Sequence, residues 1–273
     1  MAKTVRELLN KAHSLYDNGE WNKSLEILEN QETISRASPQ EAGEMGVLTG
    51  FNYWKKGERE NAFYLWRNVV DEESEGWTKI AAASAHAGLG MYYAEKGEKE
   101  KALEHARLAQ DLLPEDATLN QVMNLNACGI TLANIGELER AEEVLRRVAK
   151  TNEQLEKSGD SAVAQKAMHQ RGKNGYNRVS LVLIPQKRWD MALYELLKEV
   201  IPRYEEVGAE TDLAAAHHRV SEIWINMGNL DAALNAEEDS RLLWKRHEDD
   251  VPGRVKMSEQ NIVQIRKLMR ERE

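Results

Sequence analysis

A short turn recurs along the chain and constrains the fold more than any other feature. Its glycine can adopt the left-handed backbone conformation that ends a helix. Five residues later comes a small residue, which allows a second helix to approach the first closely. The turn positions are Gly19, Gly57, Gly97, Gly136, Lys187 (in place of glycine) and Gly228. The small residues that follow them are Ser24, Ala62, Ala102, Ala141, Ala192 and Ala233.

Two more columns align when the chain is registered on these turns. Seven residues before each turn stands a small residue, and four residues before it stands a large apolar one. The small residues are Ala12, Gly50, Gly90, Gly129, Ser180 and Ser221, and the large ones are Leu15, Tyr53, Tyr93, Leu132, Leu183 and Trp224. One helix hairpin cannot bury its own apolar face, so six copies predict an array in which neighbours cover one another.

The clearest copy is Gly88–Pro114, which resembles one tetratricopeptide repeat. The turns are 38, 40, 39, 51 and 41 residues apart, longer than the roughly 34 residues usual for that family, so the chain is similar to its long-repeat variant. The resemblance covers the whole chain. It implies an all-α, right-handed solenoid of about six antiparallel helix hairpins, closed by a C-terminal capping helix.

We expect one repeat domain over residues 1–273. Ser38 and Glu41 flank Pro39 in a capping-box pattern that begins the second repeat. The wide fourth spacing indicates either longer helices or a loop inserted near Lys157–Ser161. The expected repeats are 4–37, 38–73, 75–114, 115–157, 160–207 and 209–249, with a capping helix over 252–272.

Composition excludes several classes of function. The formal net charge of −9 argues against a nucleic-acid partner, which needs a basic face. The single cysteine, Cys128, excludes an internal disulfide and a multi-cysteine zinc site. No apolar run has the length of a signal or a membrane span, and no nucleophile–base pair or metal spacing is present. We therefore expect a non-catalytic cytoplasmic protein without cofactor or metal.

The resemblance implies that the first helix of each repeat lines a concave groove that binds a peptide segment of a partner. The N-terminal part of this row is apolar and aromatic, and the C-terminal part is rich in amides and arginines. Asparagine can read a peptide backbone, and arginine can hold a carboxylate, so an acidic ligand segment is expected there. The candidate residues are Tyr16, Phe51, Trp54, Met91, Asn126, Ile130, Asn177, Arg178, Leu181, His218 and Arg219.

Plainer interpretations stay open. Phe51 and Trp54 have the spacing of core residues, and Arg178 and Arg219 can pair with glutamates of neighbouring helices. Two other functions also fit a helical repeat. One is a receptor that changes superhelical pitch on binding a short signalling peptide. We expect the first repeat to begin by about Thr4, and on that expectation the extra domain that such receptors often carry does not fit. The other is a self-assembling scaffold.

Overall fold

The computed structural model describes residues 3–17, 19–71, 78–113, 118–249 and 251–272, and every regular element in these ranges is a helix. The chain is thus an all-α helical repeat, as predicted. Its contacts gather into two halves, Met1–Arg140 and Ala141–Glu273, which are described separately. The single domain over 1–273 stays a prediction. The expected repeat boundaries at 73–75 and 114–115, including Pro114, lie outside the described residues.

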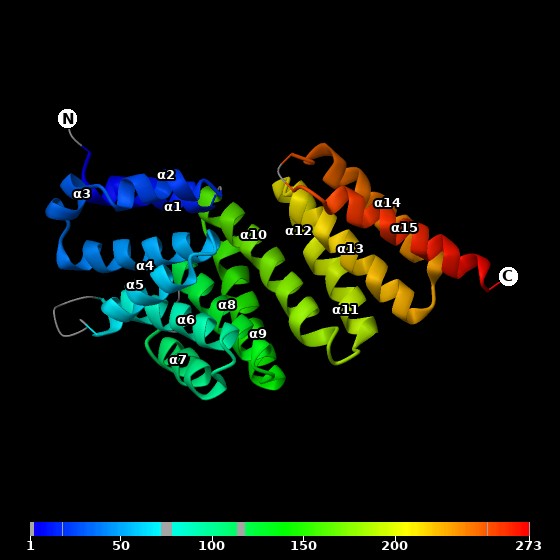
Figure 1. Cartoon of the computed structure of the whole chain (residues 1–273), viewed down its shortest axis with the longest axis horizontal. Coiled ribbons are helices and arrows are strands. Elements are labelled where there is room, and N and C mark those ends of the chain that lie inside the picture. Colours follow the sequence, from blue (N-terminus) through cyan, green and yellow to red (C-terminus); the bar gives the residue numbers. More distant parts are fainter. Residues whose placement is uncertain (1–2, 18, 72–77, 114–117, 250, 273) are drawn as a thin grey trace. The chain divides into compact units, whose positions relative to one another are not determined.

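The N-terminal half is built from antiparallel helix pairs (Figure 1). Helix α1 packs on α2, α4 on α5 and α6 on α7, and α6 also packs on α4 and α8. The helices are α1 (Val5–Asp17), α2 (Trp21–Leu28), α3 (Gln31–Arg36), α4 (Pro39–Lys55), α5 (Arg59–Asp71), α6 (Lys79–Glu95), α7 (Lys99–Asp111) and α8 (Leu119–Asn134). The capping box predicted at Ser38 and Glu41 is present, and it begins α4.

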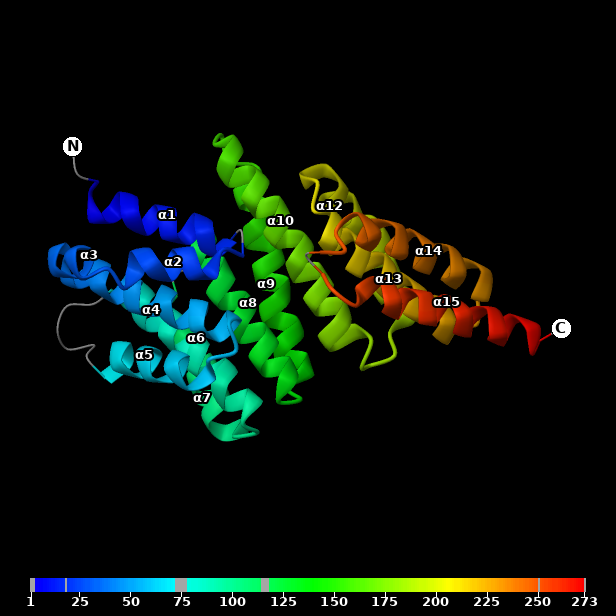
Figure 2. The ribbon, with the colours of Figure 1, turned by 45° about the horizontal axis from the view of Figure 1, so that its top comes forward.

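The C-terminal half continues the pattern, and Figure 2 shows α13, α14 and α15 side by side. The last helix, α15, is the capping helix that the sequence predicted at 252–272. The helices are α9 (Leu138–Glu156), whose first residues precede the division between the halves, α10 (Ser161–Arg178), the π-helix η2 (Val179–Leu183), α11 (Trp189–Glu195), the π-helix η3 (Leu196–Val200), α12 (Ile201–Val207), α13 (Glu210–Met227), α14 (Leu230–Arg246) and α15 (Arg254–Arg270).

The turns have the predicted backbone. All five turn glycines have positive φ, between 77° at Gly97 and 90° at Gly136. Lys187 occupies the same conformation with φ 56°, and no other described non-glycine residue has a positive φ. The turn therefore demands the left-handed conformation even where the sequence has lost its glycine.

The small residues after the turns are packing positions, as predicted: all six are fully buried. In the N-terminal half, Gly50 and Gly88 both face the indole of Trp66, and a Cβ atom built on either would lie 2.4 Å from that ring. Ordinary side chains do not fit there. The two glycines thus make the space in which Trp66 is fully buried between α4, α5 and α6.

The wide spacing between the fourth and fifth repeats comes from longer helices. Helix α9 has 19 residues, and α10 with η2 continues from Ser161 to Leu183. Only residues 157–160 separate α9 from α10, and Asp160 caps α10 by accepting hydrogen bonds from the backbone of Ala162 and Val163. The alternative of an inserted loop near Lys157–Ser161 is thus wrong.

Candidate functional site

The predicted aromatic anchors lie together in the N-terminal half. Phe51 and Trp54 contact Trp66, with ring centroids 5.0 Å and 5.7 Å apart, and Met91 packs against the same cluster. All three candidates are half-buried. They serve as packing residues and still present part of their surface to solvent, so the two interpretations of this group are compatible.

Trp54 also carries a charged neighbour. The guanidinium of Arg59 lies 4.0 Å from the indole centroid, and its Nε donates to both carboxylate oxygens of Glu95 at 3.0 and 3.1 Å. A cation held over an aromatic face by a carboxylate keeps its orientation. Tyr16 is apart from this group, half-buried against the core cluster of α1, α2 and α4, where burial raises the pKa of its hydroxyl.

The remaining amide and apolar candidates are half-buried on first helices. Asn126 and Ile130 lie on α8, Asn177 lies on α10, and Leu181 lies on η2. All four lie on the first helix of a repeat and expose part of their surface, as residues that contact a ligand must. That these residues contact a ligand stays a prediction.

Arg219 and His218 differ although they are adjacent. Arg219 reaches from α13 to α10, donating through Nε to the Tyr176 hydroxyl at 3.3 Å, and it also pairs with Glu222. His218 turns to α14, where its Nδ1 lies 3.0 Å from Glu237. Its side chain is only 14% exposed. Arg219 therefore faces the first-helix surface, whereas His218 belongs to the contact between α13 and α14.

Arg178 forms ion pairs with two glutamates. Its guanidinium donates to Glu142 on α9 at 2.7 Å and to Glu195 on α11, and its side chain is 12% exposed. The alternative that the sequence left open for this arginine, pairing with neighbouring helices, is the one observed. An arginine bound on both sides offers little to the carboxylate of a ligand.

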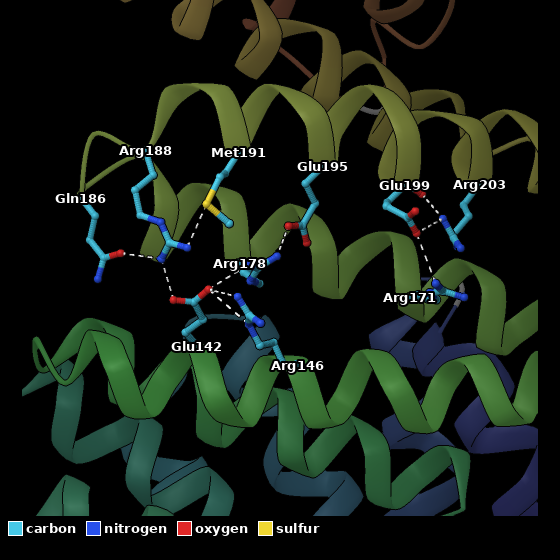
Figure 3. Close-up of polar contacts among 10 residues, drawn as sticks. All are labelled: Glu142, Arg146, Arg171, Arg178, Gln186, Arg188, Met191, Glu195, Glu199 and Arg203. Carbon is cyan, nitrogen blue, oxygen red and sulfur yellow. Dashed lines mark hydrogen bonds and ion pairs between the residues drawn. The ribbon is translucent and has the colours of Figure 1, made fainter.

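Glu142 is the centre of this network (Figure 3). It accepts hydrogen bonds from Arg178 on α10, from Arg188 (2.6 Å) in the turn before α11, and from Arg146 (2.9 Å) on its own helix α9. Burial opposes ionisation of Glu142, but its hydrogen bonds to the three arginines outweigh burial and lower its pKa to about 2. Glu142 is thus a fixed negative charge that joins the fourth repeat to the fifth.

A second network lies further along the same helices (Figure 3). Arg171 on α10 donates to Glu156 on α9 at 2.9 Å and to Glu199 on η3 at 3.2 Å. Arg203 on α12 pairs with the same two glutamates, at 3.5 Å and 3.0 Å. Charged groups therefore link α9, α10 and the α11–α12 segment at two levels. The π-helices η2 and η3 begin directly after Arg178 and Glu195, the partners of one ion pair.

A cleft opens beside the first network. Its volume is about 500 Å³, within the range of ligand pockets, and its lining comes from α9, α10, α11 and η3. On α11, Met191 and Tyr194 are exposed to 43% and 64%. The lining residues are Arg146, Arg178, Asp190, Met191, Tyr194, Glu195 and Glu199. Sequence reasoning identified only Arg178 among them, because the others lie on second helices, where the family resemblance implies no ligand.

The other reactive groups are structural. Cys128 is fully buried, and burial raises the pKa of its thiol to about 12. Nδ1 of His86 lies 2.9 Å from Nδ1 of His105, and burial, followed by the charge of His86, lowers the pKa of His105 to about 4. The described residues contain no group of three or more potential metal ligands. Within the same residues, no helix combines the length and apolarity of a membrane span.

Comparison with known proteins identifies the fold. No family model and no curated protein sequence matches the chain. The apo form of RapI is similar with a TM-score of 0.74 and 12% identity, over 98% of this chain and 72% of RapI. BtubC (BKLC) from P. vanneervenii is similar at 0.58 and 14%, over 90% and 93%. A Rap protein complexed with Competence and Sporulation Factor gives 0.55 and 12%, over 96% and 87%.

At these identities the likeness concerns the fold alone. The chain folds as a tetratricopeptide-type helical repeat protein, which is the class that its turn and packing columns predicted.

Proposed function

We propose that this chain is a non-catalytic interaction module that binds a peptide segment of a partner protein along its first helices. The observation that carries the proposal is the link between two successive first helices, in which Arg219 on α13 donates to Tyr176 on α10. This contact places a partly exposed arginine next to α10, which carries Asn177 and is followed directly by η2 with Leu181. Amide, guanidinium and apolar groups then form one strip, the mixture that binds extended peptides with both affinity and specificity.

We assign an acidic ligand residue to Arg219, which is 33% exposed and pairs with the single exposed carboxylate of Glu222. Arg178 is less suitable because Glu142 and Glu195 hold it on both sides and it is 12% exposed. Apolar ligand residues are assigned to the exposed parts of Phe51, Trp54 and Met91. The two groups lie in different halves, so each is tested separately.

A displayed library of random linear peptides provides ligands for the test. Selected peptides are synthesised and titrated by calorimetry against the wild type and Arg219→Ala. Loss of a charge-assisted contact should weaken binding about tenfold, more so for peptides with an acidic residue. Arg107→Ala is the matched control, because Arg107 lies on a second helix and is 67% exposed. Selected peptides that bind Arg219→Ala, Asn177→Ala and Trp54→Ala as tightly as the wild type would refute the proposal.

A receptor for a short signalling peptide is the second candidate, and one comparison favours it. A Rap protein with a similar fold is complexed with Competence and Sporulation Factor. A receptor of this kind changes its shape when the peptide binds. Small-angle scattering with a selected peptide distinguishes the two functions: a fall in the radius of gyration supports the receptor, and an unchanged radius supports the simple interaction module.

A further inference from the structure

The cleft beside Glu142 is lined mostly by the second-helix elements α9, α11 and η3, and Arg178 is its lining residue from the first helix α10. Met191 and Tyr194 stand at its edge on α11, and Leu197 follows on η3 with 41% exposure. Three of the nine large hydrophobic side chains that are exposed among the described residues lie in this one segment, and a contiguous exposed apolar patch is the kind of surface that marks an interaction site. Tyrosine and methionine are also residue types enriched in binding sites between proteins.

Most of the charged residues that line the cleft already have a partner of opposite charge. Arg146 and Arg178 both donate to Glu142, and Arg178 also pairs with Glu195. Glu199 pairs with Arg171 and with Arg203. Arg188, outside the lining, is a third cation on Glu142 and donates to the Met191 sulfur at 3.0 Å. Among the lining residues themselves, two arginines face three carboxylates, those of Asp190, Glu195 and Glu199.

Asp190 is the remaining charge. It lines the cleft in the first turn of α11, is exposed, and has no ion pair among the described residues. It lies four residues before Tyr194, so the carboxylate and the ring emerge from the same face of the helix. An unpaired carboxylate beside an exposed aromatic ring is the arrangement that binds a cation through an ion pair and a cation–π contact.

We propose that this cleft binds an arginine side chain carried by a segment of a partner protein. The guanidinium lies over the Tyr194 ring and pairs with Asp190, and its aliphatic stem, with an adjacent apolar ligand residue, covers Met191. Arginine suits the site because its flat cation stacks on aromatic rings and retains an apolar stem. The chain's net charge of −9 favours approach of a basic segment.

The test uses four capped tripeptides, acetyl-Leu-X-Leu-amide with X as arginine, lysine, glutamine or glutamate. Binding to the full chain is followed by NMR of methionine methyl groups, in which the Met191 signal, assigned with Met191→Leu, reports on the cleft. The arginine probe should bind at least threefold more tightly than glutamine, and glutamate should bind most weakly. Asp190→Asn and Tyr194→Ala should each weaken the arginine probe about threefold, the range of exposed ion pairs and cation–π contacts.

Matched controls exist elsewhere in the chain. Tyr64 is 62% exposed on α5, and Asp231 lies exposed in the first turn of α14, so Tyr64→Ala and Asp231→Asn should leave the affinity unchanged. Equal affinity of the arginine and glutamine probes, tighter binding of glutamate, or no movement of the Met191 signal would overturn the proposal. So would an equal loss in the control variants. None of these outcomes bears on peptide binding at Arg219.

Discussion

At the scale of single residues, two glycines decide how the second and third repeats meet. Gly50 and Gly88 both pack against the Trp66 indole, whose Nε1 donates to the Val47 carbonyl at 3.3 Å. Gly90 is only two residues from Gly88, yet a Cβ there would meet its nearest neighbour, a methyl group of Thr131, at an ordinary 3.4 Å. Comparing alanine substitutions at Gly88 and Gly90 therefore separates the effect of steric overlap from the effect of helix propensity.

We expect Gly88→Ala to lower the free energy of unfolding by about 2 kcal/mol, because the added methyl overlaps Trp66 and overpacking outweighs the better helix propensity. Gly90→Ala is the control and should be neutral or stabilising by up to about 1 kcal/mol. Urea unfolding followed by circular dichroism measures both. Equal effects of the two substitutions would show that Trp66 can move aside.

Lys187 is a second position where the backbone conformation affects stability. A non-glycine residue in the left-handed region costs about 1 kcal/mol, and Lys187 sits there with φ 56°. We expect Lys187→Gly to raise the free energy of unfolding by about 0.5 to 1 kcal/mol, and Lys187→Ala to leave it unchanged. Lys198→Gly, within η3, should lower it by about 1 kcal/mol. A destabilised Lys187→Gly would indicate that the lysine side chain, rather than its backbone, matters at this turn.

At the scale of helices, ion pairs join α9 to the α10–α11 hairpin. Arg178 and Glu195 are both nearly buried, and burial raises the pKa of Glu195 although the charge of Arg178 opposes it. Such a pair is costly to break on one side, because the partner is left buried and unpaired.

We expect Arg178→Met to lower the free energy of unfolding by about 3 kcal/mol. Adding Glu195→Gln to that variant should restore part of the loss, because the neutral amide no longer needs a cation. A double-mutant cycle measured by urea unfolding gives the coupling. Purely additive losses would contradict the assigned pairing, and Arg107→Ala, in an exposed helix pair, should change stability by less than about 0.5 kcal/mol.

A buried carboxylate helps to hold the capping helix α15. Glu237 on α14, 1% exposed, accepts hydrogen bonds from Ser258 (2.8 Å) and Asn261 (3.3 Å) on α15, and His218 lies on its other side. Burial opposes ionisation of Glu237, but these contacts outweigh it and lower its pKa. The lowered pKa means that ionised Glu237 stabilises the fold above pH ~4.3, the ordinary value for glutamate, and that this contribution is lost as the pH falls through its lower folded pKa.

We therefore expect Glu237→Gln to lower the free energy of unfolding by about 2 kcal/mol at pH 7, and the gap to the wild type to close as the pH falls below ~4. Urea unfolding, repeated at steps of about one pH unit between pH 3 and 7, measures this difference in the free energy of unfolding. Glu238→Gln is the control, because Glu238 is 40% exposed and pairs with Arg266 at the surface. A gap that is independent of pH would mean that Glu237 acts through packing rather than through its charge.

At the scale of the whole molecule, the contacts form two halves, each with its own buried clusters. The N-terminal half buries the cluster around Trp66, and the C-terminal half buries a cluster that includes Leu196 and Tyr204. In a repeat array each unit depends on its nearest neighbours, so stability varies along the chain.

Hydrogen exchange tests this directly. We expect Gly88→Ala to speed amide exchange in α4 to α8 and to leave α13 to α15 unchanged, because the overlap with Trp66 is confined to the N-terminal half. Glu237→Gln should show the reverse pattern, which makes each variant the control for the other. Uniform acceleration over the whole chain would show that the 273 residues unfold as one cooperative unit.

The sequence by itself determined the repeat, its turns and its packing columns, because these depend on residues close together in the chain. Glycine at a left-handed turn and a small residue five positions later act within one hairpin. Lys187, which stands at the same turn position, adopts the same left-handed backbone conformation. Partners distant in sequence were decided only by the tertiary structure. Glu142 meets Arg178 from 36 residues away, and many exposed glutamates had the same local pattern. Only the packed helices select which carboxylate reaches which arginine, and thus leave Asp190 and Tyr194 beside an open cleft.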